Sequence, residues 1–198
     1  MAVSTTGGIS LSVFRAVLLL PFLLSLLVGS VQAATTNAIV LENLKTNGVA
    51  PPSEWDVVGP GDPNIQGYAS DTSVNKGDTV HFKIDTGATN YVIKIYRLGY
   101  YNGNGARLIT NLLPAVAPPQ IQPEPIVDTE TGLIDCGNWT ESASWKVPTN
   151  ATSGVYIARP TINGNGGASH IIFVVRDDNG GSELLFQTSD MTWHSYYS

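Results

Sequence analysis

Short runs in which apolar and polar residues alternate recur along most of the chain. In residues 79–85, Val80, Phe82 and Ile84 fall on one face, and the positions between them are polar or charged. This alternation is typical of a strand in an antiparallel sheet with one buried face. The same alternation, or a short run rich in β-branched and aromatic residues, predicts strands at 38–43, 53–58, 65–71, 91–96, 107–110, 143–147, 153–159 and 169–176.

Residues 91–107 hold the sharpest local pattern, a strand that runs into a glycine-dense turn. The dipeptides Asn102-Gly103 and Asn104-Gly105 both favour tight turns. Strand-like composition resumes at residues 107–110. The stretch is therefore predicted to form two partner strands joined by an aromatic turn that contains Tyr100 and Tyr101.

Turn and loop signals separate the predicted strands at short intervals. Residues 73–78 and 177–181 have turn composition, and five prolines between 113 and 125 exclude a central strand or a helix there, so we expect a surface loop. No helical period is sustained after the first 33 residues. Short strands with frequent turns predict an all-β fold, and we expect an immunoglobulin-like antiparallel β-sandwich over residues 34–187.

The first 33 residues have the composition of a cleaved signal peptide. Arg15 is their only charge and precedes an apolar core at 16–28. That core is shorter than the roughly 20 apolar residues of a membrane span, and it contains Pro21. Cleavage before Ala34 is therefore favoured over an uncleaved anchor, and the protein is predicted to be secreted or periplasmic.

Charge and cysteine content narrow the possible partners. Sixteen Asp and Glu oppose ten Lys and Arg, which gives a net charge of −6 at pH 7. Phosphate binding needs a basic face, so no nucleic-acid partner is expected. Cys136 is the only cysteine, and no internal disulfide can form. Its thiol is interpreted as buried and inert, with pairing to another chain as the alternative.

Candidate chemistry concentrates in the C-terminal tail. The sequence holds no Gly-Lys-[Ser/Thr] phosphate loop and no Gly-x-Ser-x-Gly nucleophile elbow. Asp177 and Asp178 fit either a calcium site or an ordinary hairpin turn. Residues 186–198 gather Trp193, His194, Tyr196 and Tyr197. A tyrosine phenolate is a good hard ligand for ferric iron, so Tyr196 or Tyr197 could bind a metal. The same cluster is also typical of aromatic packing at a sandwich edge.

Several of these segments together resemble one family. Residues 95–107, Ile-Tyr-Arg-Leu-Gly-Tyr-Tyr-Asn-Gly-Asn-Gly-Ala-Arg, are similar to the hallmark of proteins like the large (β) subunit of N,N-dimethylformamidase. Further matching segments follow in order at 136–139, 143–148, 153–156, 169–178 and 186–193. The resemblance implies a β-rich N-terminal region that precedes a larger α/β domain, and residues 188–198 would open that domain.

The resemblance also implies an activity. The family enzyme is an amidohydrolase, which uses a mononuclear iron held by two tyrosines and a glutamate to split a small formamide into an amine and formate. Tyr196 matches the tyrosine of the family's Thr-Trp-x-x-Tyr element and is the one candidate iron ligand. The chain departs from the family at Tyr197-Ser198, where an Asn and a Trp-Gly-Gly-like run usually follow.

The remaining metal ligands would lie beyond Ser198, so this polypeptide by itself is expected to be inactive and its catalytic residues stay unassigned. The resemblance implies a downstream α/β domain of the same protein as partner, with a small second subunit or a homo-oligomer as further possibilities.

Two other functions stay open on the residues alone. Tyr100, Tyr101, Trp55 and Trp139, if exposed, could stack on sugar rings in a secreted carbohydrate- or surface-binding module, although packing explains aromatic residues equally well. Trp193 and His194 are further binding candidates in such a module. A purely structural role in a surface layer or fibre is the third alternative.

Overall fold

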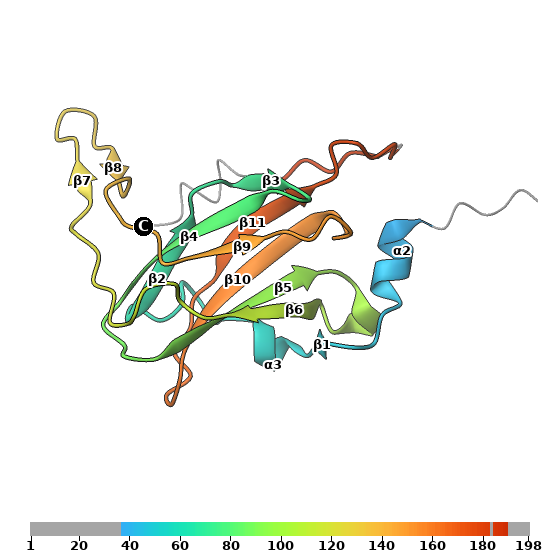
Figure 1. Cartoon of the computed structure of the whole chain (residues 1–198), viewed down its shortest axis with the longest axis horizontal. Coiled ribbons are helices and arrows are strands. Elements are labelled where there is room, and N and C mark those ends of the chain that lie inside the picture. Colours follow the sequence, from blue (N-terminus) through green and yellow to red (C-terminus); the bar gives the residue numbers. More distant parts are fainter. Residues whose placement is uncertain (1–36, 183, 190–198) are drawn as a thin grey trace, which may run out of the picture. The chain divides into compact units, whose positions relative to one another are not determined.

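Two β-sheets face each other in the computed structural model, which describes residues 37–182 and 184–189. The described strands are β1 (Val49–Ala50), β2 (Ile65–Ala69), β3 (Ser73–Asn75), β4 (Thr79–Thr86), β5 (Tyr91–Leu98), β6 (Ala106–Leu112), β7 (Ile126–Val127), β8 (Ile134–Asp135), β9 (Ala143–Lys146), β10 (Gly154–Ile162) and β11 (Ile171–Arg176). One sheet has the order β1-β6-β5-β10-β11-β3 and the other β2-β4-β9, while β7 and β8 pair only with each other. Figure 1 shows β4 and β9 lying over β10 and β11.

The core between the sheets follows from the alternation in the sequence. Val80, Phe82 and Ile84 of β4 are fully buried, and the ring of Phe82 meets that of Phe173 from β11 edge-on, with centroids 5.7 Å apart. Burying a large apolar side chain stabilises a fold by roughly 1.5–3 kcal/mol. The predicted all-β sandwich is confirmed, and strands occupy all the segments predicted between 65 and 176.

One predicted turn begins as a strand. Residues 73–78 were expected to form a turn, but Ser73–Asn75 is β3, which pairs in parallel with β11. Val74 is buried and lies opposite Val175, so packing places this short segment in the sheet. The turn follows at Gly77, whose φ of 91° suits glycine. The described sheets are therefore antiparallel except for this one pair.

The strands predicted at 38–43 and 53–58 are wrong, because both segments contain helices. Helix α2 (Ala38–Asn43) is capped by Asn37, whose side-chain oxygen accepts from the backbone N–H of Ile39 at 2.9 Å. Helix α3 (Pro52–Trp55) starts with a proline, which suits the first turn of a helix. Neither of these described helices is long enough to cross a membrane.

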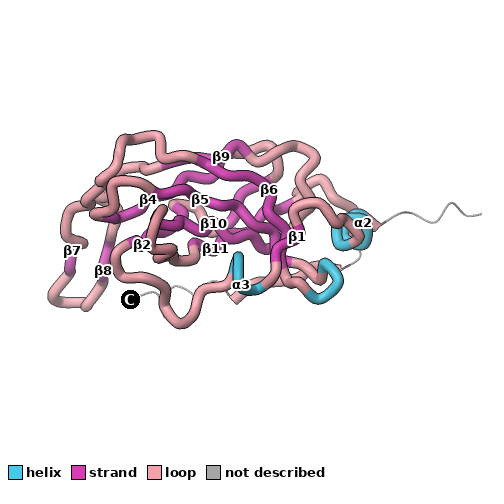
Figure 2. Tube along the Cα trace, turned by 90° about the horizontal axis from the view of Figure 1, so that it is seen from below, coloured by secondary structure: helices cyan, strands magenta, loops and turns pink. Residues whose placement is uncertain are grey.

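The proline-rich loop and the hairpin that follows it differ in how far they are buried against the sandwich. Gln120 is buried and pairs through its backbone with Thr86 of β4, so the predicted surface loop is partly built into the sandwich. The hairpin of β7 and β8 has no comparable burial, and all four of its strand residues are exposed. Figure 2 shows this hairpin and α2 at opposite ends of the sandwich.

Candidate functional site

The hallmark segment, residues 95–107, forms the end of β5, an aromatic turn and the start of β6. The turn contains the short helix η1 (Tyr101–Gly103) and packs against both α2 and α3. Asn43, the last residue of α2, accepts a hydrogen bond from the backbone N–H of Tyr100 at 2.5 Å. A Cβ atom on Gly99 would come within 2.6 Å of that same Asn43 oxygen, so glycine permits this close approach.

Helix α3 meets the other side of the turn through Trp55. Its indole N–H donates to the backbone carbonyl of Asn104 at 2.8 Å. Gly105 has a φ of 86°, and a Cβ atom there would lie 2.6 Å from the Trp55 ring. Gly99 and Gly105 therefore let the hallmark turn come into close contact with both α2 and α3.

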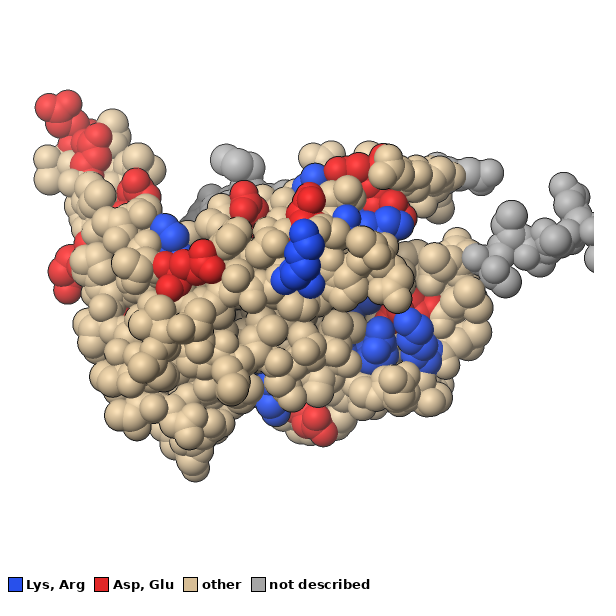
Figure 3. Space-filling model, viewed as in Figure 1, with Lys and Arg blue, Asp and Glu red and all other residues tan. Residues whose placement is uncertain are grey.

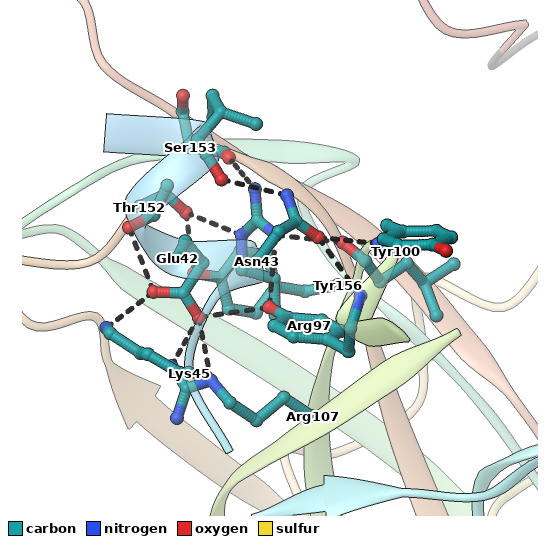
Figure 4. A network of polar contacts seen from close by, with 12 residues as sticks. Glu42, Asn43, Lys45, Arg97, Tyr100, Arg107, Thr152, Ser153 and Tyr156 are labelled. Carbon is teal, nitrogen blue, oxygen red and sulfur yellow. Dashed lines mark hydrogen bonds and ion pairs between the residues drawn. The ribbon is translucent and has the colours of Figure 1, made fainter. Parts of the chain in front are cut away.

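The carboxylate of Glu42 is the centre of the polar contacts between α2 and the sheet (Figure 4). Its Oε1 accepts from the Tyr101 hydroxyl at 3.0 Å and from Arg107 Nε at 2.7 Å. Its Oε2 accepts from Lys45 Nζ at 2.6 Å and from Thr152 Oγ1 at 3.2 Å. Glu42 is 2% exposed, so this carboxylate exchanges nearly all its water contacts for protein donors.

Arg97 extends the same network toward β10. Its guanidinium donates to the backbone carbonyls of Thr152 at 3.3 Å, Ser153 at 2.8 Å and Leu98 at 3.0 Å. It also donates to the Tyr101 hydroxyl at 3.1 Å, which links it to Glu42. We call the set Glu42, Lys45, Arg97, Tyr101, Arg107 and Thr152 the latch.

Electrostatics fix the protonation states in the latch. Burial by itself would raise the pKa of Glu42, but hydrogen bonds from Lys45, Arg107 and Tyr101 outweigh it and lower that pKa to about 2. Burial is the largest cause that raises the pKa of Tyr101 above its ordinary value. At neutral pH an ionised carboxylate therefore accepts from a neutral phenol.

The chemistry open to the latch is limited, because its acceptors are already used. An ionised carboxylate offers about four lone-pair positions, and Glu42 receives donors from Lys45, Tyr101, Arg107 and Thr152. Among the described residues, no group of three or more His, Cys, Asp or Glu could hold a metal ion. The latch therefore joins α2, the hallmark turn, β6 and the loop before β10, and it leaves no coordination position open.

The residues predicted from the sequence as binding candidates differ in their exposure, and some of them lie outside the described residues. Tyr100 is 70% exposed and meets the condition for stacking on a ligand, whereas Tyr101 is 1% exposed inside the latch and does not. Trp193, His194 and Tyr196 lie outside the described residues, so their roles as binding candidates and as iron ligand stay predictions.

The two tryptophans proposed for sugar stacking lie on different elements. Trp55 is half-buried under the hallmark turn. Trp139 is half-buried near the base of the β7–β8 hairpin, where its ring lies 5.9 Å from that of Tyr68 and its N–H donates to the carbonyl of Pro123. The structure therefore brings Trp55 and Tyr100 to the same turn and keeps Trp139 apart from them.

The structure bears on two sequence-based alternatives, the calcium site or turn at Asp177 and Asp178 and the state of the Cys136 thiol. Asp177 accepts from Lys76 at 2.5 Å, and Asp178 forms a two-bond ion pair with Arg176. These ion pairs and a turn that returns the Gly180 N–H to Asp177 match the hairpin-turn interpretation. Cys136 is a free, half-buried cysteine among the described residues.

An open cleft lies at the end of the sandwich where β4 leads to β5. It has a volume of about 650 Å³, and its lining includes the polar residues Asn64, Asp85, Asn90, Asn163 and Asn165. None of the described lining residues is aromatic. The cleft therefore does not provide the stacking surface that the carbohydrate hypothesis called for.

Sequence reasoning missed Glu42, Asn43 and Thr152 as members of a site. The sequence pattern predicts a strand around Glu42, and Thr152 lies between the strands predicted at 143–147 and 153–159. One local sign was available, because Asn37 is a favoured N-cap residue and so favours a helix over 38–43 that ends at Glu42 and Asn43. Arg97 and Arg107, inside the hallmark, were the partners to test.

Comparisons with curated proteins and with solved structures give no close relative of this chain. No curated protein matches the chain. A crystal structure of a Salmonella alpha-2-macroglobulin mutant matches with 17% identity and a TM-score of 0.33. That match covers 65% of this chain and 7% of the other, so this chain spans a small part of that protein.

A family model described as "N,N-dimethylformamidase beta subunit-like, C-terminal" matches residues 92–198. The match begins within β5, includes the hallmark segment and covers more than half of the chain. Its description names a C-terminal region, and the position predicted for this chain, in the N-terminal β-rich part of a longer protein, stays a prediction. The chain belongs to the N,N-dimethylformamidase beta subunit-like family.

Proposed function

We propose that this chain is the β-sandwich portion of a secreted dimethylformamidase-like protein that hydrolyses the C–N bond of a small amide. In this proposal the sandwich positions the start of an α/β domain, and most of the iron-dependent active site is supplied by sequence beyond Ser198. One observation carries the proposal. The family match runs through residues 186–198, where the Thr192-Trp193-x-x-Tyr196 element stands.

Tyr196 offers the kind of donor atom that the proposed metal prefers. A phenolate is a hard, anionic oxygen ligand, and Tyr196 would supply one such ligand. When bound, iron would contribute Lewis-acid activation of the amide carbonyl and of water. The products of that hydrolysis are an amine and formate if the substrate is a formamide. The role of the latch in this proposal is mechanical, since it fixes α2 and the hallmark turn to the sheet that leads into the tail.

The first test uses the natural protein isolated from its own source, with Tyr196→Phe and Tyr197→Phe variants made at its locus. We expect Tyr196→Phe to lose most of the bound iron and formate release from a small formamide, because Phe keeps the ring and removes the phenolate. Tyr197→Phe is the matched control and should keep both. The measurements are iron per polypeptide by elemental analysis and formate by enzymatic assay.

Intact mass decides how a negative result is interpreted. A wild-type protein with the mass of residues 34–198, free of iron and inactive on formamides, contradicts the proposal. Equal iron content in the two tyrosine variants contradicts the assignment of Tyr196 as an iron ligand. The proposed amide hydrolysis would then depend on other iron ligands.

A second candidate, a non-catalytic surface- or carbohydrate-binding module, is favoured by Tyr100. This aromatic residue is 70% exposed at the tip of the hallmark turn. Stacking on a sugar ring predicts that Tyr100→Ala abolishes retention on a glycan array, whereas Tyr100→Phe keeps it. Retention that is unchanged in Tyr100→Ala, or absent in the wild type, rules against this candidate.

A further inference from the structure

The β7–β8 hairpin projects four large apolar side chains into solvent. We call residues 124–137 the arm; its base is held by hydrogen bonds from Tyr68 to the Cys136 carbonyl and from Lys83 to the Gly137 carbonyl. Along it, Ile126, Val127, Leu133 and Ile134 are 55–62% exposed. A two-stranded hairpin alone is only marginally stable in water. The arm is therefore anchored at its base and has an apolar surface without a described partner.

Within the arm, the strand register gathers apolar groups on one side. Val127 lies directly opposite Ile134, so the two side chains share a face. Ile126 lies opposite Asp135 on the other face. The Val127–Ile134 pair is the compact part of this surface.

A second apolar surface lies around α2. Val40 and Leu44 are 56% and 70% exposed, and their spacing of four residues places them on one side of the helix. Leu41 and Ile39 are 49% and 40% exposed, and Tyr100 adjoins the end of the helix through Asn43. We call Ile39, Val40, Leu41, Leu44 and Tyr100 the helix patch.

The two surfaces carry opposite charge. The arm holds Glu124, Asp128, Glu130 and Asp135 and has no Lys or Arg. Beside the helix patch, Lys45 and Arg107 both pair with the single carboxylate of Glu42, and the buried Arg97 donates to Tyr101 next to them, so positive charges outnumber negative ones there. Figure 3 shows acidic residues along the arm and a group of basic residues over the sheet near α2. Complementary potentials favour specific association.

We propose that the arm of one copy docks on the helix patch of a second copy. The two surfaces lie at opposite ends of the sandwich (Figure 2), so the contact is heterologous, head to tail. Such a contact repeats from copy to copy and builds a row, unless the rotation between copies closes a ring. The apolar pair Val127–Ile134 lies against Val40 and Leu44, and the net negative charge of the arm comes close to the net positive charge of the latch.

The test exploits the head-to-tail geometry. Ile134→Asp removes the arm contact, Leu44→Asp removes the helix contact, and Val58→Asp changes an even more exposed apolar residue outside both surfaces. Sedimentation velocity is recorded for each protein from micromolar to millimolar concentration. We expect the wild type and Val58→Asp to associate into species larger than dimers, and each of the other two variants to associate at least about tenfold more weakly.

Mixing the two defective variants is the decisive measurement. Each keeps one intact surface, so an equimolar mixture of Ile134→Asp and Leu44→Asp should form dimers that do not grow further. High salt should weaken all these associations, because charges are screened beyond about 3 Å at about 1 M.

Three outcomes overturn the proposal. A wild type that sediments as a monomer at every concentration leaves no self-association to explain. Association that survives in both single variants places the contact elsewhere. A mixture that stays monomeric excludes a head-to-tail contact between these surfaces, and circular dichroism of each variant shows that a loss of association is not a loss of folding.

Discussion

Glu42 shows how one residue can organise a fold that otherwise depends on apolar packing. It lies on a helix of six residues, too short to be stable by itself in water. Its carboxylate is surrounded by donors from four separate parts of the chain. A buried charge of this kind adds little net stability over an apolar replacement, yet removing one partner leaves the others uncompensated.

Replacing Glu42 by Gln should therefore destabilise the protein strongly. Gln keeps the shape of the side chain but removes the negative charge, and the half-buried Arg107 then loses its anion. We expect the free energy of unfolding at pH 7 to fall by about 3 kcal/mol. Urea unfolding followed by tryptophan fluorescence measures this, and Glu130→Gln, at an exposed site, should change it little.

The pH dependence of unfolding in the wild type and in Glu42→Gln tests whether the lost charge causes the destabilisation. The pKa of Glu42 is about 2 in the folded protein against an ordinary value of 4.5, so the unfolded state takes up the proton first as pH falls. The stabilisation is present above pH 4.5 and is lost as pH falls to about 2. The stability difference between wild type and Glu42→Gln should shrink across this window, and a difference that stays constant would assign the effect to packing.

At the scale of elements, the hallmark turn is the piece that brings helices to the sheet. Gly103 and Gly105 both have a φ of 86°, but their surroundings differ. A Cβ atom on Gly103 would meet nothing within 4 Å, whereas one on Gly105 would lie 2.6 Å from the Trp55 ring. The two positions therefore separate backbone strain from side-chain crowding.

Alanine at each glycine should show this separation. Gly103→Ala should lower the free energy of unfolding by about 1 kcal/mol, the cost of a left-handed backbone for a residue with a Cβ. Gly105→Ala should lower it by about 1–3 kcal/mol more, because the Trp55 ring must move. Urea unfolding measures both. Equal losses at the two positions would mean that Trp55 adapts without strain.

The elements that the sequence predicted well carry their signal in their own side chains. The alternation in β4 and β5 comes from residues that face the core directly. Helix α2 carries no such signal, since its state depends on Arg107 and Thr152, which lie 65 and 110 residues away along the chain. The burial of Tyr101 could not be predicted for the same reason, because turn composition does not reveal a buried carboxylate partner.

The candidate metal site could be predicted only as far as the resemblance reaches. Tyr196 was identified from the family's Thr-Trp-x-x-Tyr element, and neither composition nor spacing singled it out from Tyr197. The hallmark glycines were predicted as turn residues from local chemistry alone, and positive φ angles at Gly103 and Gly105 agree with that. Their role in admitting Trp55 and Asn43 needed the folded arrangement.

At the scale of the whole molecule, the sandwich separates two kinds of surface. One end holds the latch, where buried charges fix α2 to the sheet. The other holds the arm, which the sandwich supports only at its base. The head-to-tail assembly proposed above follows from this separation, because neither surface can satisfy the other within one copy.

The span of the latch along the chain has a consequence for how the protein is made. Glu42 emerges from the ribosome early, but its partner Thr152 is synthesised 110 residues later. During that interval the carboxylate of Glu42 lacks part of its set of donors, and contacts between such distant residues form slowly. The N-terminal segment therefore stays undocked, and accessible to chaperones and to other nascent chains, until the strand after Thr152 has been synthesised and the fold can close.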